Sequence, residues 1–402
     1  MRNKNFLGRS GRDRSVTHDS RSVRKGWINL PMMRAIVLIQ GVLVVAGMGS
    51  LKREVVVQYG EVLHATYAEA LLEAKKLEKE ISEFVARPTE AGLAAAKKQW
   101  TRSRYPYSQS EVARFYSGPI DDEDGFEGWI NAWPIDEAYL DYVKGKPKAG
   151  LINHPETVRG VDEETLFELN EQGGEADICT GYHAIEFLLW GQDFYADSPG
   201  KRPLSDYTTQ EFSKRRRDAL QACARLLVTH LSTLEAEWSP GKSNYRRRFE
   251  AAPERESLGK ILTGMAMLAG FELASERLAV AYETQSQEDE HSCFSDTTHL
   301  DLIHNIKGIC NVWMGSYGEV EGKGVRELAA SLDEALANRI TKTLEQCLSN
   351  AGEIPVPFDQ AFLGEDTAPG RTKILRCIES LEALKKDLLT LGRKADLGLA
   401  LN

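Results

Sequence analysis

The sequence predicts an all-α protein built from two tandem four-helix-bundle-like domains with long irregular connecting loops. Three observations lead to this prediction. Apolar residues recur at spacings of three and four over long stretches, which is the pattern of amphipathic helices. The alternation of apolar and polar residues that marks half-buried strands is scarce. The chain has 402 residues, a length that favours two domains over one.

The helices can be placed from local signals along the chain. The first carries an apolar stripe from Tyr59 to Phe84 and ends before Pro88, and the second begins after Thr89, a residue type that favours the N-cap. Further helices are expected over about 209–238, 256–284, 297–313, 325–350 and 374–391. The irregular stretches are 117–136, 193–208 and 283–296. Loops of this length in a helical protein are often where sites are built.

The N-terminus differs in composition from the rest of the chain. Residues 1–34 hold nine of the 50 basic residues but two of the 60 acidic ones, and residues 35–49 (AIVLIQGVLVVAGMG) carry no charge. This apolar run has the length of a signal-peptide core and is short for a membrane span of roughly 20 residues. We therefore expect export to the periplasm or cell envelope, with retention as a membrane anchor through 35–49 as the alternative. Translation could start at Met1, Met32 or Met33, and a later start would give a short basic region before the apolar run.

These features divide the chain into three expected parts. Residues 1–49 form the N-terminal extension with its signal peptide or anchor, residues 50–205 the first bundle, and residues 206–402 the second. The part from residue 50 onward is strongly acidic, which argues against a nucleic-acid partner, because such binding needs a positive footprint. The protein is membrane-associated only if the N-terminal segment is retained.

One apolar segment carries a polar pair that needs an explanation. In GYHAIEFLLWGQD (181–193), His183 and Glu186 are three residues apart and project from one face of a helix that is apolar nearly all round. A buried carboxylate is costly unless it is paired, hydrogen-bonded or bound to a metal. The pair could therefore close a polar network between helices, or it could supply two ligands to a metal. Spacing permits a metal site without proving one, because two ligands are too few.

The same segment resembles the G-x-H-x-x-E signature of the imelysin-like family, in particular its iron-regulated protein A branch. Four more blocks resemble that branch in the expected order: AKKQWTRSRYPYSQSEVARFYSGPID (96–121), INAWPIDEAYLDYV (130–143), ILTGMAMLAGFELASERLAVA (261–281) and QEDEHSCFSDTTHLDL (287–302). The resemblance covers roughly residues 50 to 320 and, more loosely, the rest of the chain. It implies two four-helix-bundle-like domains with a site at their interface, an envelope location and a link to iron uptake.

The resemblance also implies metal ligands and a set of neighbouring site residues. His183 and Glu186 match the proposed metal ligands, and the metal would be a divalent or ferric ion, iron or zinc. The other expected site residues, which would hold a cofactor or ligand, are Arg104, Tyr107, Glu111, Asp136, Ser295 and Asp296. This chain departs from the family at Tyr105, which stands where an acidic residue is expected, so a role for that position is in doubt.

The residues themselves allow simpler roles for several of these positions. Arg104 could neutralise Glu186, or it could take part in a surface ion pair with no functional role. Asp136 follows Pro134 and is well placed to cap the next helix. In the acidic loop EDEHSCFSDTTH (288–299), His291, Cys293, Asp296 and His299 are potential metal ligands, whereas Ser295 or Asp296 is equally suited to cap the following helix. The resemblance implies that this loop folds over the cleft between the two bundles.

Three functions of different classes follow. The first is a non-enzymatic envelope protein that binds a metal ion or a small metal-bearing ligand in the interdomain cleft and takes part in iron acquisition, with other envelope iron-uptake proteins as partners. The second is an imelysin-type metallopeptidase with His183 as ligand and Glu186 as ligand or general base, but neither H-E-x-x-H nor H-x-x-E-H is present. The third is a scaffold that binds a polymer or a partner protein.

Overall fold

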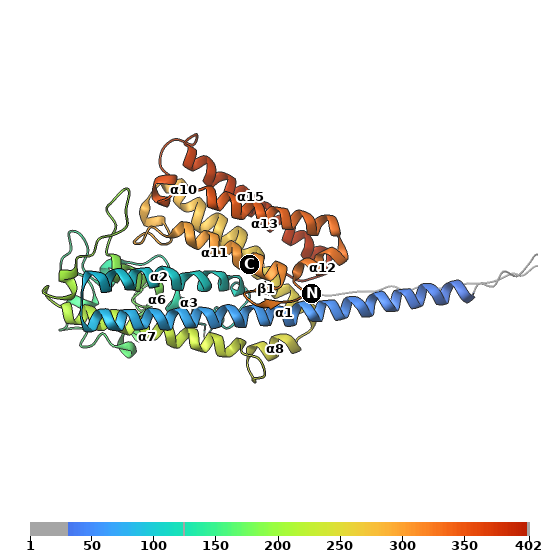
Figure 1. Ribbon diagram of the computed structural model, residues 1–402, viewed down its shortest axis with the longest axis horizontal. Coiled ribbons are helices and arrows are strands. Elements are labelled where there is room, and N and C mark those ends of the chain that lie inside the picture. The colour runs from blue at the N-terminus through green and yellow to red at the C-terminus, as the bar shows by residue number, and fades with distance from the viewer. Residues whose placement is uncertain (1–30, 124, 400–402) are drawn as a thin grey trace, which may run out of the picture. The chain divides into compact units, whose positions relative to one another are not determined.

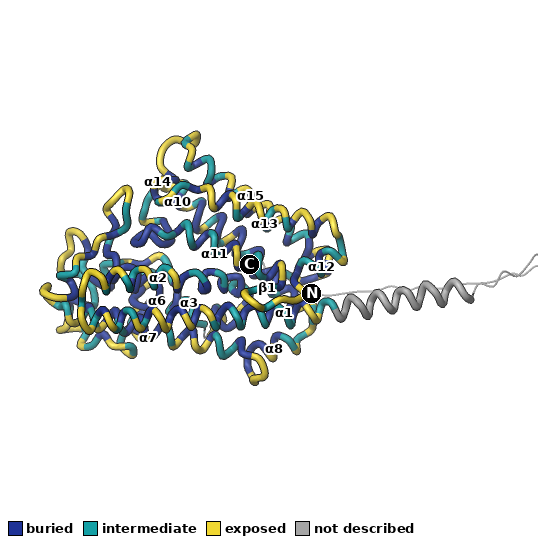
Figure 2. Tube along the Cα trace, viewed as in Figure 1, coloured by how far each residue is buried: buried dark blue, intermediate teal, exposed yellow. Residues whose placement is uncertain are grey.

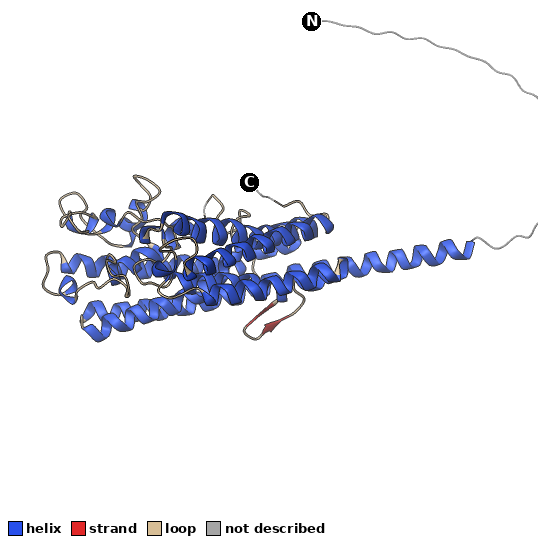
Figure 3. Ribbon diagram, turned by 90° about the horizontal axis from the view of Figure 1, so that it is seen from above, coloured by secondary structure: helices blue, strands red, loops and turns tan. Residues whose placement is uncertain are grey.

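The computed structural model describes residues 31–123 and 125–399, and for residues 31–50 it describes the backbone alone. The described chain is helical almost throughout (Figure 1, Figure 3). Its strands, within these residues, are the short antiparallel pair β1 (Ser316–Tyr317) and β2 (Val320–Glu321). The predicted all-α class is confirmed.

The helices of the first half begin with α1, whose backbone runs unbroken from Pro31 to Ala86. The helices that follow are α2 (Glu90–Ser110), α3 (Glu127–Ile130), α4 (Glu137–Leu140), α5 (Glu163–Leu169) and α6 (Gly181–Trp190), with short 3-10 turns at η1 (Glu111–Ala113), η2 (Leu151–Asn153) and η3 (Leu204–Tyr207). Thr89 caps α2 as expected, because its side chain accepts a hydrogen bond from the Gly92 amide at 3.0 Å. Helix α2 continues through Pro106.

The second half is built from longer helices. They are α7 (Ser213–Trp238), α8 (Tyr245–Ala251), α9 (Glu254–Met267), the π-helix η4 (Leu268–Ala279), α10 (Val280–Thr284), α11 (Thr298–Met314), α12 (Val325–Leu332), α13 (Glu334–Glu353), α14 (Phe358–Ala361) and α15 (Pro369–Lys394), with a 3-10 turn at η5 (Gln287–Asp289). The expected helix over 325–350 is divided at Asp333, whose carboxylate accepts a hydrogen bond from the Leu336 amide and so starts α13.

The expected helix over 256–284 is present, but its middle is not α-helical. Helix α9 passes directly into the π-helix η4, which passes into α10. In a π-helix the backbone amide bonds five residues back, so side chains five apart come onto one face. This change of register matters for the site described below.

Residues 48–402 form one compact unit. Helices α2 and α7 both pack against α6, which is buried along its whole length (Figure 2). Helices α13 and α15 pack against each other, and α15 also packs against α9 and η4. Contact between α11 and α2 joins these two groups. The expected boundary between 205 and 206 stays a prediction; α7, which follows it, packs against α5 and α6, which precede it.

Burial of large side chains supplies the driving force for this packing. Phe187, Leu188 and Leu189 of α6 are completely buried, and each contributes about 1.5–3 kcal/mol relative to an exposed position. Trp100 on α2 is equally buried and donates its indole N–H to the Tyr182 carbonyl at 2.9 Å. Helix α6 is therefore fixed between its neighbours by both packing and hydrogen bonding.

One helical run among the described residues, Glu254–Thr284, is long and apolar enough to cross a membrane by length and composition. Of its most apolar window, 78% is buried inside the protein, as in the core helix of a globular unit. The apolar run 35–49 lies in the part of α1 whose side chains fall outside the described residues, so the expected signal peptide or anchor stays a prediction. All six cysteines are free thiols.

Candidate functional site

Helix α6 starts where the chain approaches another backbone closely. Gly181 has a φ of +80°, and a Cβ atom there would lie 2.6 Å from the Ile130 carbonyl oxygen. Only glycine fits this close approach without strain. The helix therefore begins against the backbone of Trp129 and Ile130 and places Glu186, one turn from His183, towards the loop that precedes α11.

Glu186 has both of its carboxylate oxygens engaged. Oε1 accepts hydrogen bonds from the Ser295 amide at 3.0 Å and the Ser295 hydroxyl at 2.6 Å. Oε2 lies 2.9 Å from Nδ1 of His183. Complete burial raises the pKa of Glu186 to about 8, although the hydrogen bonds from Ser295 act in the opposite direction. Glu186 is thus a carboxyl group that can gain or lose a proton near neutral pH.

Two histidine rings meet beside this carboxyl group. The His183 and His291 ring centroids are 4.7 Å apart in an edge-to-face arrangement, and the Trp133 ring lies 4.9 Å from His183. Nδ1 of His291 is 2.9 Å from Oδ2 of Asp301. Nε2 of His183 is buried and has no hydrogen-bond partner among the residues that the structure describes. Burial lowers the pKa of both histidines, so both rings are neutral.

Each histidine is therefore held in the same way, with a carboxylate at Nδ1. This arrangement fixes the orientation of an imidazole and leaves Nε2 as the nitrogen available to a ligand, and it is common among metal-binding histidines. In a closed polar network Nε2 of His183 would have a hydrogen-bond partner. The unpartnered Nε2 therefore favours the ligand-binding role of this histidine over a purely structural one.

Arg104 does not neutralise Glu186, contrary to one expectation from the sequence. Its guanidinium group lies 3.0 Å from Oδ1 of Asp301 and also donates to Oδ1 of Asn131. Burial alone would raise the pKa of Asp301, but Arg104 holds it well below its ordinary value. Since Asp301 is the stronger partner, Arg104 stabilises the carboxylate that orients His291 and leaves Glu186 without an ion pair to a basic side chain.

A second buried cluster adjoins the histidine pair. Glu111 lies 2.8 Å from Arg277 and 3.1 Å from Arg114, and Glu272 lies 2.7 Å from Arg277. The pKa of Glu111 is lowered to about 2, because the two arginines more than offset the effect of burial. Asn131 connects this cluster to Arg104, since its Nδ2 lies 3.4 Å from Oε1 of Glu111.

The π-helix η4 makes the Glu272–Arg277 contact possible. In an α-helix two residues five apart point roughly 140° away from each other. In a π-helix the same spacing brings them to one face. The twelve residues of η4 therefore direct both side chains towards α2 and the segment that follows it.

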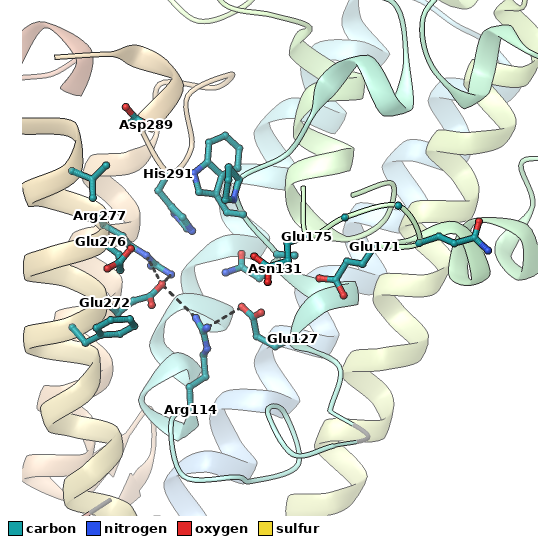
Figure 4. Close-up of a pocket in the computed structure, with 18 residues that line it drawn as sticks. Arg114, Glu127, Asn131, Glu171, Glu175, Glu272, Glu276, Arg277, Asp289 and His291 are labelled. Atoms are coloured by element: carbon teal, nitrogen blue, oxygen red, sulfur yellow. Dashed lines mark hydrogen bonds and ion pairs between the residues drawn. The ribbon is translucent and has the colours of Figure 1, made fainter. Parts of the chain in front are cut away.

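Both clusters border one pocket of about 970 Å³ (Figure 4). One side is formed by residues 114–134 and the loop 171–175, and the other by residues 271–291. In Figure 4, His291 and Asn131 lie between the two sides, Arg114 lies below them, and Arg277 lies on the side formed by η4. The pocket thus separates chain segments from the two halves of the sequence. His183 does not line it but packs against His291, which does.

The remaining expected site residues have different positions. Tyr107 is buried against Tyr182, with ring centroids 5.1 Å apart, and its hydroxyl has no hydrogen-bond partner. Asp136 is exposed and caps α4 by accepting from the Ala138 amide at 3.0 Å, which confirms the capping prediction. Asp296 is hydrogen-bonded to Asp193.

The prediction that Ser295 or Asp296 caps the following helix is wrong. Helix α11 begins at Thr298, and its N-cap residue is Thr297, which makes no side-chain capping bond. Ser295 cannot act as the cap because its hydroxyl donates to Glu186. Asp296 has a φ of +56°, which is a left-handed conformation and not that of an N-cap residue.

Reasoning from the sequence missed Asn131, Arg277 and Asp301 as parts of the site, and it left His291 open between two roles. Arg277 and Glu272 carried a usable signal: both lie in an otherwise apolar helical segment, so both needed partners, as Glu186 did. Across residues 31–123 and 125–399, no group of three or more His, Cys, Asp or Glu side chains is arranged to hold a metal ion. Metal ligation by His183 and Glu186 therefore stays a prediction.

Comparisons with known proteins agree with the fold. The family model for imelysin matches residues 63–388. Iron-regulated protein A from Synechococcus elongatus is 28% identical over 315 residues, which make up 74% of each chain.

Two crystal structures share the arrangement of helices. An iron-regulated protein A precursor from Parabacteroides distasonis superimposes with a TM-score of 0.68 at 17% identity, covering 86% of this chain and 95% of its own. An imelysin-like protein from Psychrobacter arcticum superimposes with a TM-score of 0.64 at 12% identity, covering 88% of this chain and 98% of its own. Since the family model spans most of the sequence, this chain belongs to the imelysin family.

Proposed function

We propose that this protein binds a small metal-bearing ligand in the pocket in front of His291 and that this binding serves iron acquisition. The iron link is supported by the similarity to a protein named iron-regulated protein A. A pocket of about 970 Å³ suits a small molecule, which needs far more space than a bare ion.

The observation that carries the proposal is the pair of neutral imidazoles. His291 lines the pocket, and His183 lies behind it with an unpartnered Nε2. Asp301 and Glu186 hold the two rings at Nδ1. A metal ion carried by the bound molecule would meet imidazole nitrogens that are already neutral and oriented. Binding would then require neither deprotonation nor much reorientation of these side chains.

The same geometry favours binding over peptide hydrolysis. A general base needs a carboxylate oxygen that can reach a water molecule, but both oxygens of Glu186 are occupied by Ser295 and His183. Glu186 is better placed to orient His183 than to activate water. We therefore assign Glu186 a positioning role, with the metallopeptidase as the alternative.

Binding of ferrous, ferric and zinc ions and of iron chelates, measured by calorimetry on protein without a His tag, tests the proposal. His291→Ala and His183→Ala are each expected to weaken binding at least tenfold, and Asp301→Asn by about 10–100-fold, because it orients His291. The matched control is His154→Ala, which removes an exposed histidine beside Glu156. Equal affinities for all variants would overturn the proposal. Metal-dependent peptide cleavage that Glu186→Gln abolishes would favour the metallopeptidase.

We also propose that the chain is exported to the periplasm or cell envelope. The support is the basic segment 1–34 followed by the charge-free run 35–49. Intact-mass analysis of protein from a native-like host is expected to show the loss of about the first 49 residues. Full-length protein found in the cytosol alone would contradict export, whereas full-length protein in the membrane fraction would indicate an anchor.

A further inference from the structure

The carboxylates that line the pocket fall into two groups. Glu127 and Glu272 have ion pairs to Arg114 at 3.3 and 3.5 Å. Four others have no ion pair to a basic side chain within the described part of the chain: Glu171, Glu175, Glu276 and Asp289. The two arginines of the pocket cannot serve these four, because they are already engaged by Glu111, Glu127 and Glu272.

The four unpaired carboxylates lie on opposite sides of the pocket. Glu171 and Glu175 belong to the loop after α5, and Glu276 and Asp289 belong to η4 and η5 (Figure 4). Glu171 and Glu175 are close enough to repel each other. Because these like charges face one another across the opening and no basic residue of the lining is left to neutralise them, the electrostatic potential in the pocket is negative.

The pocket also offers aromatic surface to a ligand. Trp133 and Phe271 both line it; the Trp133 ring lies 6.3 Å from that of His291, and Phe271 belongs to η4. Phe271 is 43% exposed, which is unusual for a large apolar side chain. Aromatic faces attract cations and also bury the apolar parts of an organic molecule. Charge and aromatic surface together favour an organic cation.

We propose that the ligand of this pocket is a small organic molecule of net positive charge, which for a metal carrier means a cationic chelate. This inference rests on the proposed function and deepens it, because it selects one class of chelate. An anionic chelate, such as a ferric complex of a polycarboxylate, would be repelled by the four carboxylates. A neutral chelate would bind with intermediate affinity.

Three 1:1 ferric complexes of tetradentate dihydroxamates provide the test, with a linker that carries no charge (net cation), one carboxylate (net neutral) or two carboxylates (net anion). Each complex leaves two coordination positions of the iron open to the histidines. At low salt the affinity is expected to fall in that order, by at least roughly fivefold at each step, and the differences are expected to shrink at high salt. The double variant Glu171→Gln/Glu276→Gln should reduce the preference for the cation. The control Glu319→Gln/Glu353→Gln removes the same charge from exposed positions away from the pocket and should leave the order unchanged.

Each outcome bears on one of the two proposals. Affinities that do not depend on ligand charge, or a charge order that the pocket variant does not change, would overturn the cationic-ligand proposal. If His291→Ala still abolishes binding in that case, the proposed function stands. If the three chelates and the bare metal ions all fail to bind, both proposals fail.

Discussion

Glu186 and Glu111 are two fully buried carboxyl groups that flank the same pocket, yet their pKa values are shifted in opposite directions. The pKa of Glu186 is raised to about 8, whereas that of Glu111 is lowered to about 2. Both have no exposed surface, so burial penalises the charged form in both. The difference lies in their partners. Glu111 pairs with Arg277 and Arg114, and Glu186 has Ser295 and a neutral histidine.

Because of this difference, Glu111 acts as a charged structural carboxylate, whereas the charge of Glu186 depends on pH. The pKa of Glu111 is lowered to about 2, so it is ionised at neutral pH, where it pairs with two arginines that line the pocket. Burial raises the pKa of Glu186 to about 8, and its Oε2 lies 2.9 Å from Nδ1 of His183, whose Nε2 has no hydrogen-bond partner among the described residues. Hydrogen bonds from Ser295 alone do not offset the cost of burying the charge, but two guanidinium groups do.

The largest effect is expected from removing the cation of the structural cluster. Arg277→Met keeps much of the side-chain volume but removes one of the two arginines that Glu111 and Glu272 share, so that Arg114 alone is left to offset their buried charge. Breaking a buried ion pair in this way costs about 3–5 kcal/mol. Chemical denaturation at neutral pH measures the loss in the free energy of unfolding.

The double variant Glu111→Gln/Arg277→Met controls for this effect. It removes the stranded charge of Glu111 together with the arginine, so it is expected to regain part of the lost stability. A double variant as unstable as the sum of the two single variants would show that the two side chains are not coupled.

The pH dependence of stability should differ in sign between the two carboxyl groups. In the unfolded chain Glu186 loses its proton near its ordinary pKa, but in the folded protein it keeps the proton up to about pH 8. Wild-type stability therefore falls as pH rises through this window, by at most about 1.4 kcal/mol per pH unit. Glu186→Gln removes this pH-dependent term, so the stability of the variant relative to wild type should rise between about pH 4.5 and pH 8, by up to about 5 kcal/mol.

Glu111→Gln provides the opposite case. The folded-state pKa of Glu111 lies below its ordinary value, so its contribution is present above the ordinary pKa and is lost as the pH falls towards about 2. From about pH 5 to 9 the cost of Glu111→Gln should stay constant. Unfolding curves at several pH values test both variants. Parallel pH profiles for Glu186→Gln and wild type would show that Glu186 is ionised throughout, and the contrast between the two sites would be lost.

The sequence predicted the fold better than it predicted this contrast, because helix signals are local. The apolar stripe of α1 and the cap at Thr89 lie within single elements and needed no knowledge of tertiary contacts. Glu186 could be recognised as needing partners because a charge stood in an apolar helix. Its partner Ser295 lies 109 residues away in a loop without periodicity. The family resemblance placed Ser295 among the expected site residues, but no local pattern paired it with Glu186.

Arg277 shows a second limit. Its contact with Glu272 depends on the π-helix, and an α-helical interpretation of the same segment places the two residues on different faces. Arg104 was expected to neutralise a buried carboxylate, but its partner is Asp301 and not Glu186. The type of a residue indicates its charge, but it does not indicate which carboxylate lies close to it.

The smallest expected effect concerns single hydroxyl groups, and it tests the comparison most closely. Ser295 donates its hydroxyl to Glu186 at 2.6 Å, and Ser292 donates its hydroxyl to Asp301 at 2.5 Å. Asp301, like Glu111, is kept ionised by an arginine, so the hydrogen bond from Ser292 has a charged acceptor at every pH from about 5 to 9. Ser292→Ala should therefore cost about 1–2 kcal/mol across this range.

The hydrogen bond from Ser295 gains a charged acceptor only when Glu186 loses its proton. Ser295→Ala should then cost less than about 1 kcal/mol near pH 5 and more above about pH 8, with the apparent pKa of Glu186 rising further. Thermal and chemical unfolding of the two variants across this range decide the matter, because equal costs at every pH would mean that Glu186 and Asp301 have the same charge.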